Sequence, residues 1–245
     1  MRELGAMLLL LGTTVRRAFA RGIPLRELGH QLHEMGNRSL LLIVVGLACF
    51  GAAMAAHADH EAKPLIHDMA LVGPPAFHLL VRELGPILVG GLCALSLGSM
   101  VAAELGTMAQ GEQLEALVMS AGDPHAELVA PRVLAAMISL PILFTLGLAV
   151  ASFTAGTVAT YAYASDGAAW TDALFTHGAD FAFGYAKVVA FGLVIPLAGA
   201  VHGLRARGGA SSVGRAVTAG AVTAFLAVVA VDIIAASLAA AAGAY

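Results

Sequence analysis

Four ionisable residues lie within long apolar stretches of the sequence, where an isolated charge is costly. They are Arg82, Glu83, Lys187 and Asp232. One charge at the centre of a bilayer costs about 2.5–3.5 kcal/mol on insertion scales, and such residues usually mark a substrate or ion pathway. Because two are positive and two negative, we predict one neutral network that faces a polar substrate cavity. Purely structural pairing, or side chains that reach the outer headgroups, is the alternative.

The overall composition indicates that a bilayer surrounds most of the chain. Of its 245 residues, 59% are hydrophobic and 12% are charged, whereas about a quarter of a soluble domain is charged. The net charge of −3 gives no sign of the clustered basic surface that nucleic-acid binding requires. Cys49 and Cys93 both lie in apolar runs, so we expect buried free thiols and no metal site.

Five stretches are long and apolar enough to form membrane-spanning helices, each of which needs about 20 residues. They are 40–56, 77–103, 133–165, 181–201 and 216–243. Gly, Ala and Ser are frequent in these stretches, as close helix packing in lipid requires. We therefore predict an all-α integral membrane protein. One domain covers residues 1–245, with an interfacial segment at 1–38 and a transmembrane bundle at 39–245.

The basic N-terminal segment is too short in its apolar part to cross a membrane. Residues 18–20, AFA, resemble a signal-peptidase site, but Glu3 and the Arg16–Arg17 pair are unfavourable for a cleaved signal. We expect an amphipathic helix on the cytoplasmic leaflet, with a frayed basic tail as the alternative.

The distribution of lysine and arginine between the spans predicts the orientation. Arginines precede the first span and lie between spans two and three and between four and five, whereas the other side holds only Lys63. The positive-inside rule places the N-terminus in the cytoplasm and the C-terminus outside. Counting helical rise along each span then places the four buried charges in the outer half of the bilayer.

A short acidic segment at residues 112–120 lies between the second and third spans. Leu114, Leu117 and Val118 fall on one helical face, opposite Glu112 and Glu115. A helix of this length does not fold alone, so it must rest on the bilayer or on a partner protein. Its acidic residues disfavour an anionic membrane surface.

The sequence from 82 to 135, RELGPILVGGLCALSLGSMVAAELGTMAQGEQLEALVMSAGDPHAELVAPRVLA, resembles the signature of the MlaE/YrbE permease family. These are the membrane subunits of ABC transporters that work with MCE-domain lipid carriers. AKVVAFG, SVGRAVT and LAVVAVDIIA extend the resemblance, which covers roughly residues 15 to 243. One departure is Ala94-Leu95-Ser96, where the family often has Ala-Gly-Arg. Any contact that this arginine makes at the position of Ser96 is therefore in doubt.

The resemblance implies roles for particular residues. The 112–120 segment would be the coupling helix that docks on an ATPase subunit, and the four buried charges would line or buttress a lipid cavity. The residues expected to take part in coupling are Glu104, Glu112, Gln113, Leu114, Glu115, Leu117 and Asp123.

The resemblance also implies partners. They are a second copy of the chain, a cytosolic ABC ATPase that binds ATP and Mg²⁺, a periplasmic MCE-domain lipid-binding protein and a small STAS-type accessory subunit. The chain lacks a G-x-x-x-x-G-K-[ST] phosphate loop, so we expect no cofactor in it and a transporter subunit rather than an enzyme. The expected role is phospholipid transport at the bacterial inner membrane, in support of outer-membrane lipid asymmetry. A proton-coupled secondary transporter and a non-transporting membrane scaffold are the alternatives.

Overall fold

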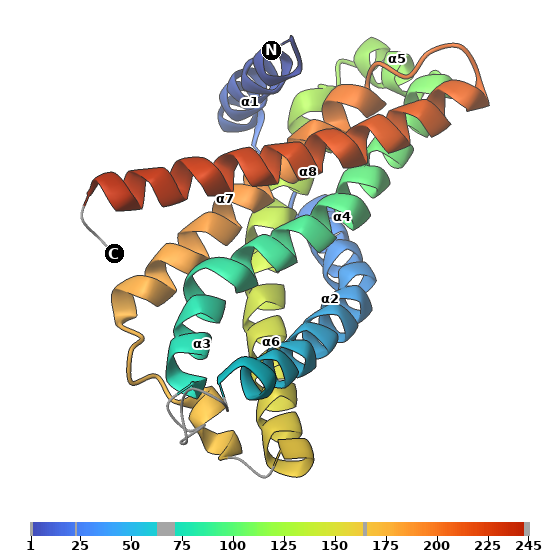
Figure 1. The fold of residues 1–245 in the computed structure, drawn as a ribbon. Helices are drawn as coiled ribbons and strands as arrows, with labels where there is room; N and C mark the ends of the chain where they lie inside the picture. Colours follow the sequence, from blue (N-terminus) through green and yellow to red (C-terminus); the bar gives the residue numbers. More distant parts are fainter. Residues whose placement is uncertain (1, 23, 63–71, 164–165, 243–245) are drawn as a thin grey trace. The chain divides into compact units, whose positions relative to one another are not determined.

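The computed structural model describes residues 2–22, 24–62, 72–163 and 166–242. Every regular element in these ranges is a helix (Figure 1). In chain order they are α1 (Arg2–Arg21), α2 (Leu25–Ala62), α3 (Gly73–Leu79), η2 (Leu80–Leu84), α4 (Gly85–Gln110), α5 (Gln113–Met119), η3 (His125–Val129), α6 (Ala130–Tyr163), η4 (Gly167–Thr171), α7 (Gly178–Gly203) and α8 (Ala210–Ala241). The elements η2 and η3 are single π-helical turns, and η4 is a 3₁₀ turn.

Five helical stretches in the described chain are long and apolar enough to cross a membrane. They are Leu25–Ala58, Gly73–Gln110, His125–Tyr163, Gly178–Gly203 and Ala210–Ala241. Each contains most or all of one predicted span, which confirms the predicted fold class. The helices extend beyond the apolar stretches because a change in polarity marks the edge of a bilayer, whereas a helix continues until a residue interrupts it.

The predicted interfacial segment at residues 1–38 is divided between two helices. Helix α1 ends at Arg21, and Gly22 follows with a positive φ of 80°, a conformation that glycine adopts without steric cost. Pro24 precedes α2, and its carbonyl accepts the first helical hydrogen bond from Leu28 N–H at 3.1 Å. The second part of the predicted segment is therefore continuous with the first span.

The chain forms two compact units, to which α2, α4, α6 and α7 each contribute. The first unit comprises Met1–Ser39, Gly90–Leu140 and Val189–Tyr245, and the second comprises Leu40–Val89 and Pro141–Val188. Because this division concerns compactness alone, the prediction of a single permease domain stays a prediction.

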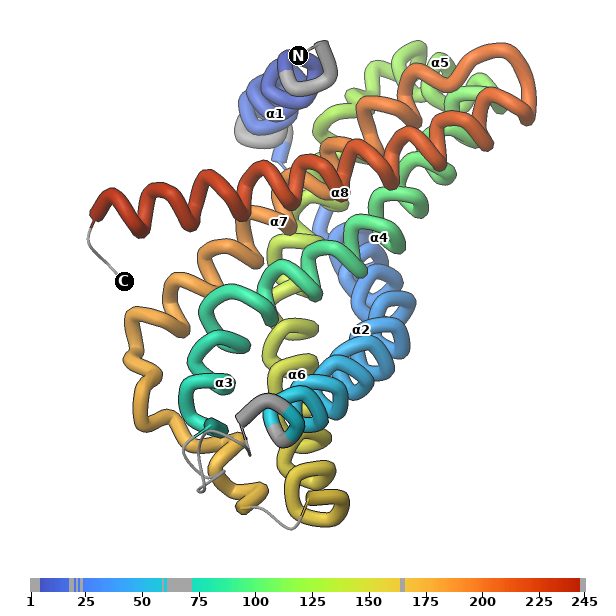
Figure 2. Tube along the Cα trace, in the orientation of Figure 1, coloured from blue at the N-terminus to red at the C-terminus, as the bar shows by residue number. Residues whose placement is uncertain are grey.

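Small residues let the helices of the first unit approach closely. In Figure 2, the second half of α4 runs beside α8. A Cβ added at Gly98 of α4 would lie 2.9 Å from the Cβ of Ala224, and one added at Gly220 would lie 2.8 Å from the Cβ of Ala102. Such small-residue contacts are the usual way in which helices pack in lipid.

In the second unit, α2 packs against α6. A Cβ at Gly147 would lie 3.1 Å from Ile43 Cγ2. At the end of this contact, Trp170 of η4 is buried with Ala55, Ala155 and Ala159. Helix α6 also contacts the first half of α7, where the ring centroids of Phe144 and Tyr185 lie 5.1 Å apart.

Candidate functional site

The RELGP sequence produces the π-helical turn η2. Pro86 has no N–H to donate to the carbonyl of Arg82, four residues earlier, and its ring would clash with that carbonyl in a regular α-helix. The turn widens instead, and the Gly85 N–H donates to the carbonyl of Leu80. A Cβ at Gly85 would lie 2.9 Å from Phe144 Cε2, so a larger residue does not fit there. Single π-turns within helices often occur at functional sites.

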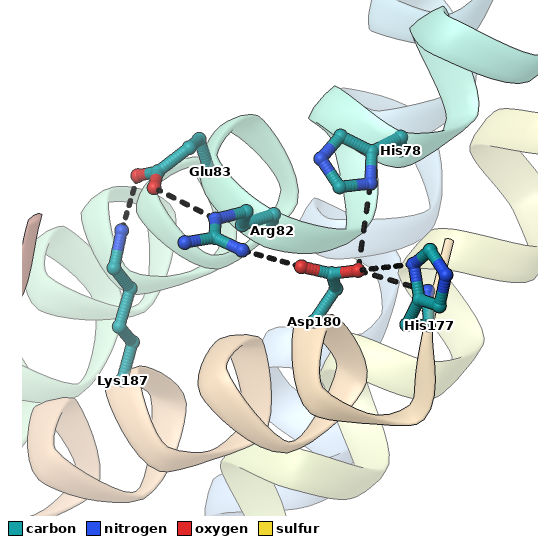
Figure 3. A network of polar contacts seen from close by, with 6 residues as sticks. All are labelled: His78, Arg82, Glu83, His177, Asp180 and Lys187. Atoms are coloured by element: carbon teal, nitrogen blue, oxygen red, sulfur yellow. Dashed lines mark hydrogen bonds and ion pairs between the residues drawn. The ribbon is translucent and has the colours of Figure 1, made fainter. Parts of the chain in front are cut away.

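Four charged side chains form a connected cluster between η2 and the first half of α7 (Figure 3). Lys187 Nζ donates to Glu83 Oε2, and Arg82 Nη1 donates to Asp180 Oδ1. Arg82 Nε lies 3.9 Å from Glu83 Oε1 and joins the two pairs. The side chain of Lys187 is only 1% exposed, whereas that of Glu83 is 22% exposed. The cluster is neutral, as the cost of burying single charges requires.

Aromatic and imidazole side chains surround the cluster. The ring centroid of Phe183 lies 5.1 Å from Arg82 Cζ and 4.9 Å from Lys187 Nζ, within cation–π range of both. On the far side, His78 Nδ1 and His177 Nδ1 lie 3.7 and 3.8 Å from Asp180 Oδ2. Figure 3 shows both rings converging on this carboxylate.

Asp180 both caps α7 and neutralises Arg82. Its Oδ2 accepts the backbone N–H of His177 at 2.8 Å, three residues earlier. This is the acidic half of a capping box at the start of the helix. Its other oxygen accepts from Arg82. The aspartate is therefore tied to the backbone of α7 and presents a fixed negative charge to η2.

The close approach of α7 to η2 depends on Gly184. A Cβ at this position would collide with the Val81 carbonyl and lie 3.5 Å from Pro86 Cγ. The absence of a side chain brings Lys187, one turn further along α7, within reach of Glu83. Glycine at such helix contacts allows backbones to approach directly.

Three of the four predicted network residues meet in this cluster. Arg82, Glu83 and Lys187 are brought together, whereas Asp232 is half-buried on α8 and belongs to the first unit. Its grouping with the other three stays a prediction. Asp180 was not expected. The sequence does carry a signal that would place Asp180 near the network. Asp180 and Lys187 are seven residues apart and therefore lie on one face of a helix.

The predicted coupling segment at 112–120 is confirmed as a helix, α5. It covers Gln113–Met119, and none of the residues in this range is buried. Leu114 and Leu117 are half-buried, while Glu112 and Glu115 are exposed. Val118 and Met119 are 57% and 88% exposed. The helix thus presents apolar and acidic side chains together on an open surface.

Glu104 lies on α4, apart from α5, in a partly buried ion pair with Arg132. Arg132 Nη2 and Nε donate to Glu104 Oε2 at 2.8 and 3.1 Å, and Arg132 Nη1 donates to the Leu128 carbonyl at 2.7 Å. Arg132 is only 2% exposed. In the sequence, Arg132 lies between the second and third apolar stretches and contributes to the predicted orientation. Its second role is to join the end of α4 to the start of α6.

Asp123, the last of the predicted coupling residues, pairs with α1. Its Oδ1 accepts from Arg17 Nη1 and from the His125 backbone N–H, both at 3.0 Å. Burial by itself raises the pKa of Asp123, but the hydrogen bonds from Arg17 and His125 N–H and the charge of Arg17 outweigh it. They hold the pKa of this carboxyl below its usual value.

In the described ranges, no group of three or more His, Cys, Asp or Glu side chains could hold a metal ion. The residue at the position of the family arginine, Ser96, is half-buried on α4, and its backbone carbonyl accepts from Ser99 Oγ at 2.9 Å.

Five long apolar helices and a neutral cluster of buried charges define a multi-pass helical membrane protein. Residues 28–238 match the family described as Permease MlaE. The chain therefore belongs to the MlaE family of ABC transporter permeases, which confirms the predicted family and the expectation of a transporter subunit rather than an enzyme.

Three curated relatives illustrate the similarity. A probable ABC transporter permease protein of Synechocystis sp. is 38% identical over 151 residues, which cover 61% of this chain and 57% of the relative. The intermembrane phospholipid transport system permease protein MlaE of Haemophilus influenzae is 34% identical over 125 residues, 49% of this chain and 46% of the relative. A probable ABC transporter permease protein of Porphyra purpurea is 30% identical over 226 residues, 91% of this chain and 85% of the relative. The chain thus spans about half the length of the first two.

Proposed function

We propose that the chain is the membrane permease subunit of an ABC transporter that moves phospholipid, or a similar amphiphile, between the inner membrane and a periplasmic MCE-domain carrier. The observation that carries this proposal is the neutral cluster of Arg82, Glu83, Asp180 and Lys187 within apolar helices. The similarity to a relative named as a phospholipid transport permease supports the choice of substrate class.

The chemistry of the cluster suits an amphiphile with a charged headgroup. Arg82 and Lys187 are buried and paired with Asp180 and Glu83, so they would attract a headgroup phosphate through their positive charge rather than bind it directly. The surrounding apolar helices suit acyl chains. In the Lys187–Glu83 pair, the side chain of Glu83 is 22% exposed and that of Lys187 is 1% exposed, so Glu83 is the more accessible of the two. Asp232, on α8, is expected in the same role from the sequence resemblance alone. The residues expected to line or buttress the cavity are therefore Arg82, Glu83, Lys187 and Asp232.

The exposed helix α5 would dock on a cytosolic ATPase that binds ATP and Mg²⁺. Its exposed apolar residues, Val118 and Met119, have the character of an interface. Glu112 and Glu115 would pair with basic residues of the ATPase. On this reading Glu104 and Asp123 support the coupling segment from the adjoining helix ends.

The remaining partners follow from the same proposal. The permease would act as a homodimer with an ATPase, an MCE-domain lipid-binding protein and a small STAS-type accessory subunit, in contact with membrane lipids and with no nucleic acid. Its N-terminus would lie in the cytoplasm and its C-terminus in the periplasm of the bacterial inner membrane.

Charge reversal on α5 tests the proposal. Glu112→Lys with Glu115→Lys should reduce ATPase co-purification and ATP-dependent transfer of fluorescent phospholipid to the MCE-domain carrier, because it places like charges at the interface. Asp172→Lys, an exposed residue between α6 and α7, should leave both unchanged. Undiminished ATPase binding and transfer in the double variant would contradict docking at α5. Lipid transfer that follows a proton gradient without ATP would instead support a secondary transporter.

A further inference from the structure

Helix α1 is fastened to the turn that follows α5. It packs against η3, and Arg17 Nη1 donates to Asp123 Oδ1 at 3.0 Å. The Arg17 side chain is 48% exposed, but that of Asp123 is only 9% exposed. The carboxylate is therefore held in place by its surroundings, and the arginine of α1 reaches it. Both residues belong to the first compact unit.

Asp123 is itself held by the start of η3. Its Oδ1 also accepts the His125 N–H, and its own N–H donates to Glu127 Oε1 at 3.0 Å. This reciprocal arrangement resembles a capping box at the start of a helix. Because Asp123 is held by these hydrogen bonds, a displacement of Arg17 would move the backbone at the start of η3 and not only the Asp123 side chain.

The connection between α5 and Asp123 is short and tightly bonded. Ala121 N–H donates to the Val118 carbonyl at 3.0 Å, and Gly122 N–H donates to the Leu117 carbonyl at 2.9 Å. Ala121 has a positive φ of 63°, and a Cβ at Gly122 would collide with the Leu117 side chain. These two hydrogen bonds and the left-handed residue form a Schellman motif, which caps the C-terminus of α5. The end of α5 is thus directly linked to Asp123.

From these contacts we infer that Arg17 is a positioning residue that makes α1 and α5 move as one piece. A displacement of α5 passes through the 120–122 turn to Asp123, and from there through the ion pair to α1. The inference rests on the proposed docking of an ATPase at α5 for its role in transport. The mechanical link itself requires only the permease.

Distance measurements on the permease without ATPase test the link. Spin labels at Gly12→Cys on α1 and Ala116→Cys on α5, with Cys49 and Cys93 replaced by alanine, report the separation of the two helices. We expect a narrow distance distribution that Arg17→Gln broadens. Arg16→Gln, the same change at the neighbouring exposed residue, should leave it narrow, and Arg17→Lys should retain part of the narrow population. Equal distributions in the Arg17→Gln and Arg16→Gln variants would overturn the inference.

Transport by the assembled complex tests the consequence. With ATPase bound, Arg17→Gln should raise the amount of ATP hydrolysed per lipid transferred, because α5 then moves without α1, whereas ATPase co-purification stays unchanged. A merely structural role would lower the amount of complex without altering this ratio. An unchanged ratio in Arg17→Gln would refute the role in transport. Loss of ATPase binding in the α5 double variant belongs to the proposed function, so the two failures are distinguishable.

Discussion

Replacing Glu83 with glutamine removes the carboxylate that pairs with Lys187, and it should destabilise the permease more than Lys187→Met does. The asymmetry follows from exposure, because the Lys187 side chain is 1% exposed and that of Glu83 is 22% exposed. A cation in the interior loses its compensating charge, whereas a half-exposed carboxylate keeps some solvent and the guanidinium of Arg82 at 3.9 Å.

The magnitudes follow from what each variant leaves behind. Breaking a buried pair costs about 3–5 kcal/mol, which we expect for Glu83→Gln. Lys187→Met lies between the buried and exposed limits, at about 1–3 kcal/mol. The double variant leaves no charge of this pair, so its cost should fall below the sum of the single costs by about 1–3 kcal/mol.

The assay is equilibrium unfolding of the purified permease in mixed micelles, completed as a double-mutant cycle. Glu115→Gln, an exposed glutamate on α5, is the matched control and should change the free energy of unfolding by less than about 0.5 kcal/mol. Strict additivity of the Glu83 and Lys187 variants would refute their direct contact. A larger loss for Lys187→Met than for Glu83→Gln would refute the reasoning from exposure.

Three further predictions concern topology, packing and pH. Cysteines introduced at Asp172 and Arg207 should react with membrane-impermeant reagents from opposite sides of the membrane, since the arginine distribution predicts it; labelling from one side would contradict the orientation. Gly184→Ala should lower the free energy of unfolding by about 1–3 kcal/mol through overpacking, whereas Gly178→Ala, with no atom within 4 Å of the added Cβ, should not lower it. Because the pKa of Asp123 is lower in the folded protein than in the unfolded chain, its carboxylate stabilises the fold above the unfolded-state pKa, and this is lost as pH falls through the folded pKa. The stability difference between the natural protein and Asp123→Asn should therefore be constant near neutral pH and shrink only below about pH 4, and an unchanged difference in acid would exclude this linkage.

The fold class was predictable because the hydrophobic effect acts on composition and length. Apolar stretches of sufficient length must be buried in lipid, and in lipid only a helix satisfies its own backbone groups. Helix α5 was predictable from local signals instead. Its amphipathic segment lies between Gly111 and the turn residues Gly122, Asp123 and Pro124, which favour a helix start and end at these points. The ends of α2 were less predictable, because polar residues continue a helix as readily as apolar ones.

The sequence by itself determined that the charges of Arg82, Glu83 and Lys187 must be compensated, because the cost of an isolated charge in an apolar interior does not depend on the detailed fold. Only the tertiary structure decided the partners. Lys187 pairs with Glu83 and Arg82 with Asp180 because α7 approaches the π-turn η2 at Gly184. That approach depends on the shape of two helices far apart in the chain, and neither helical spacing nor composition specifies which faces of two helices meet.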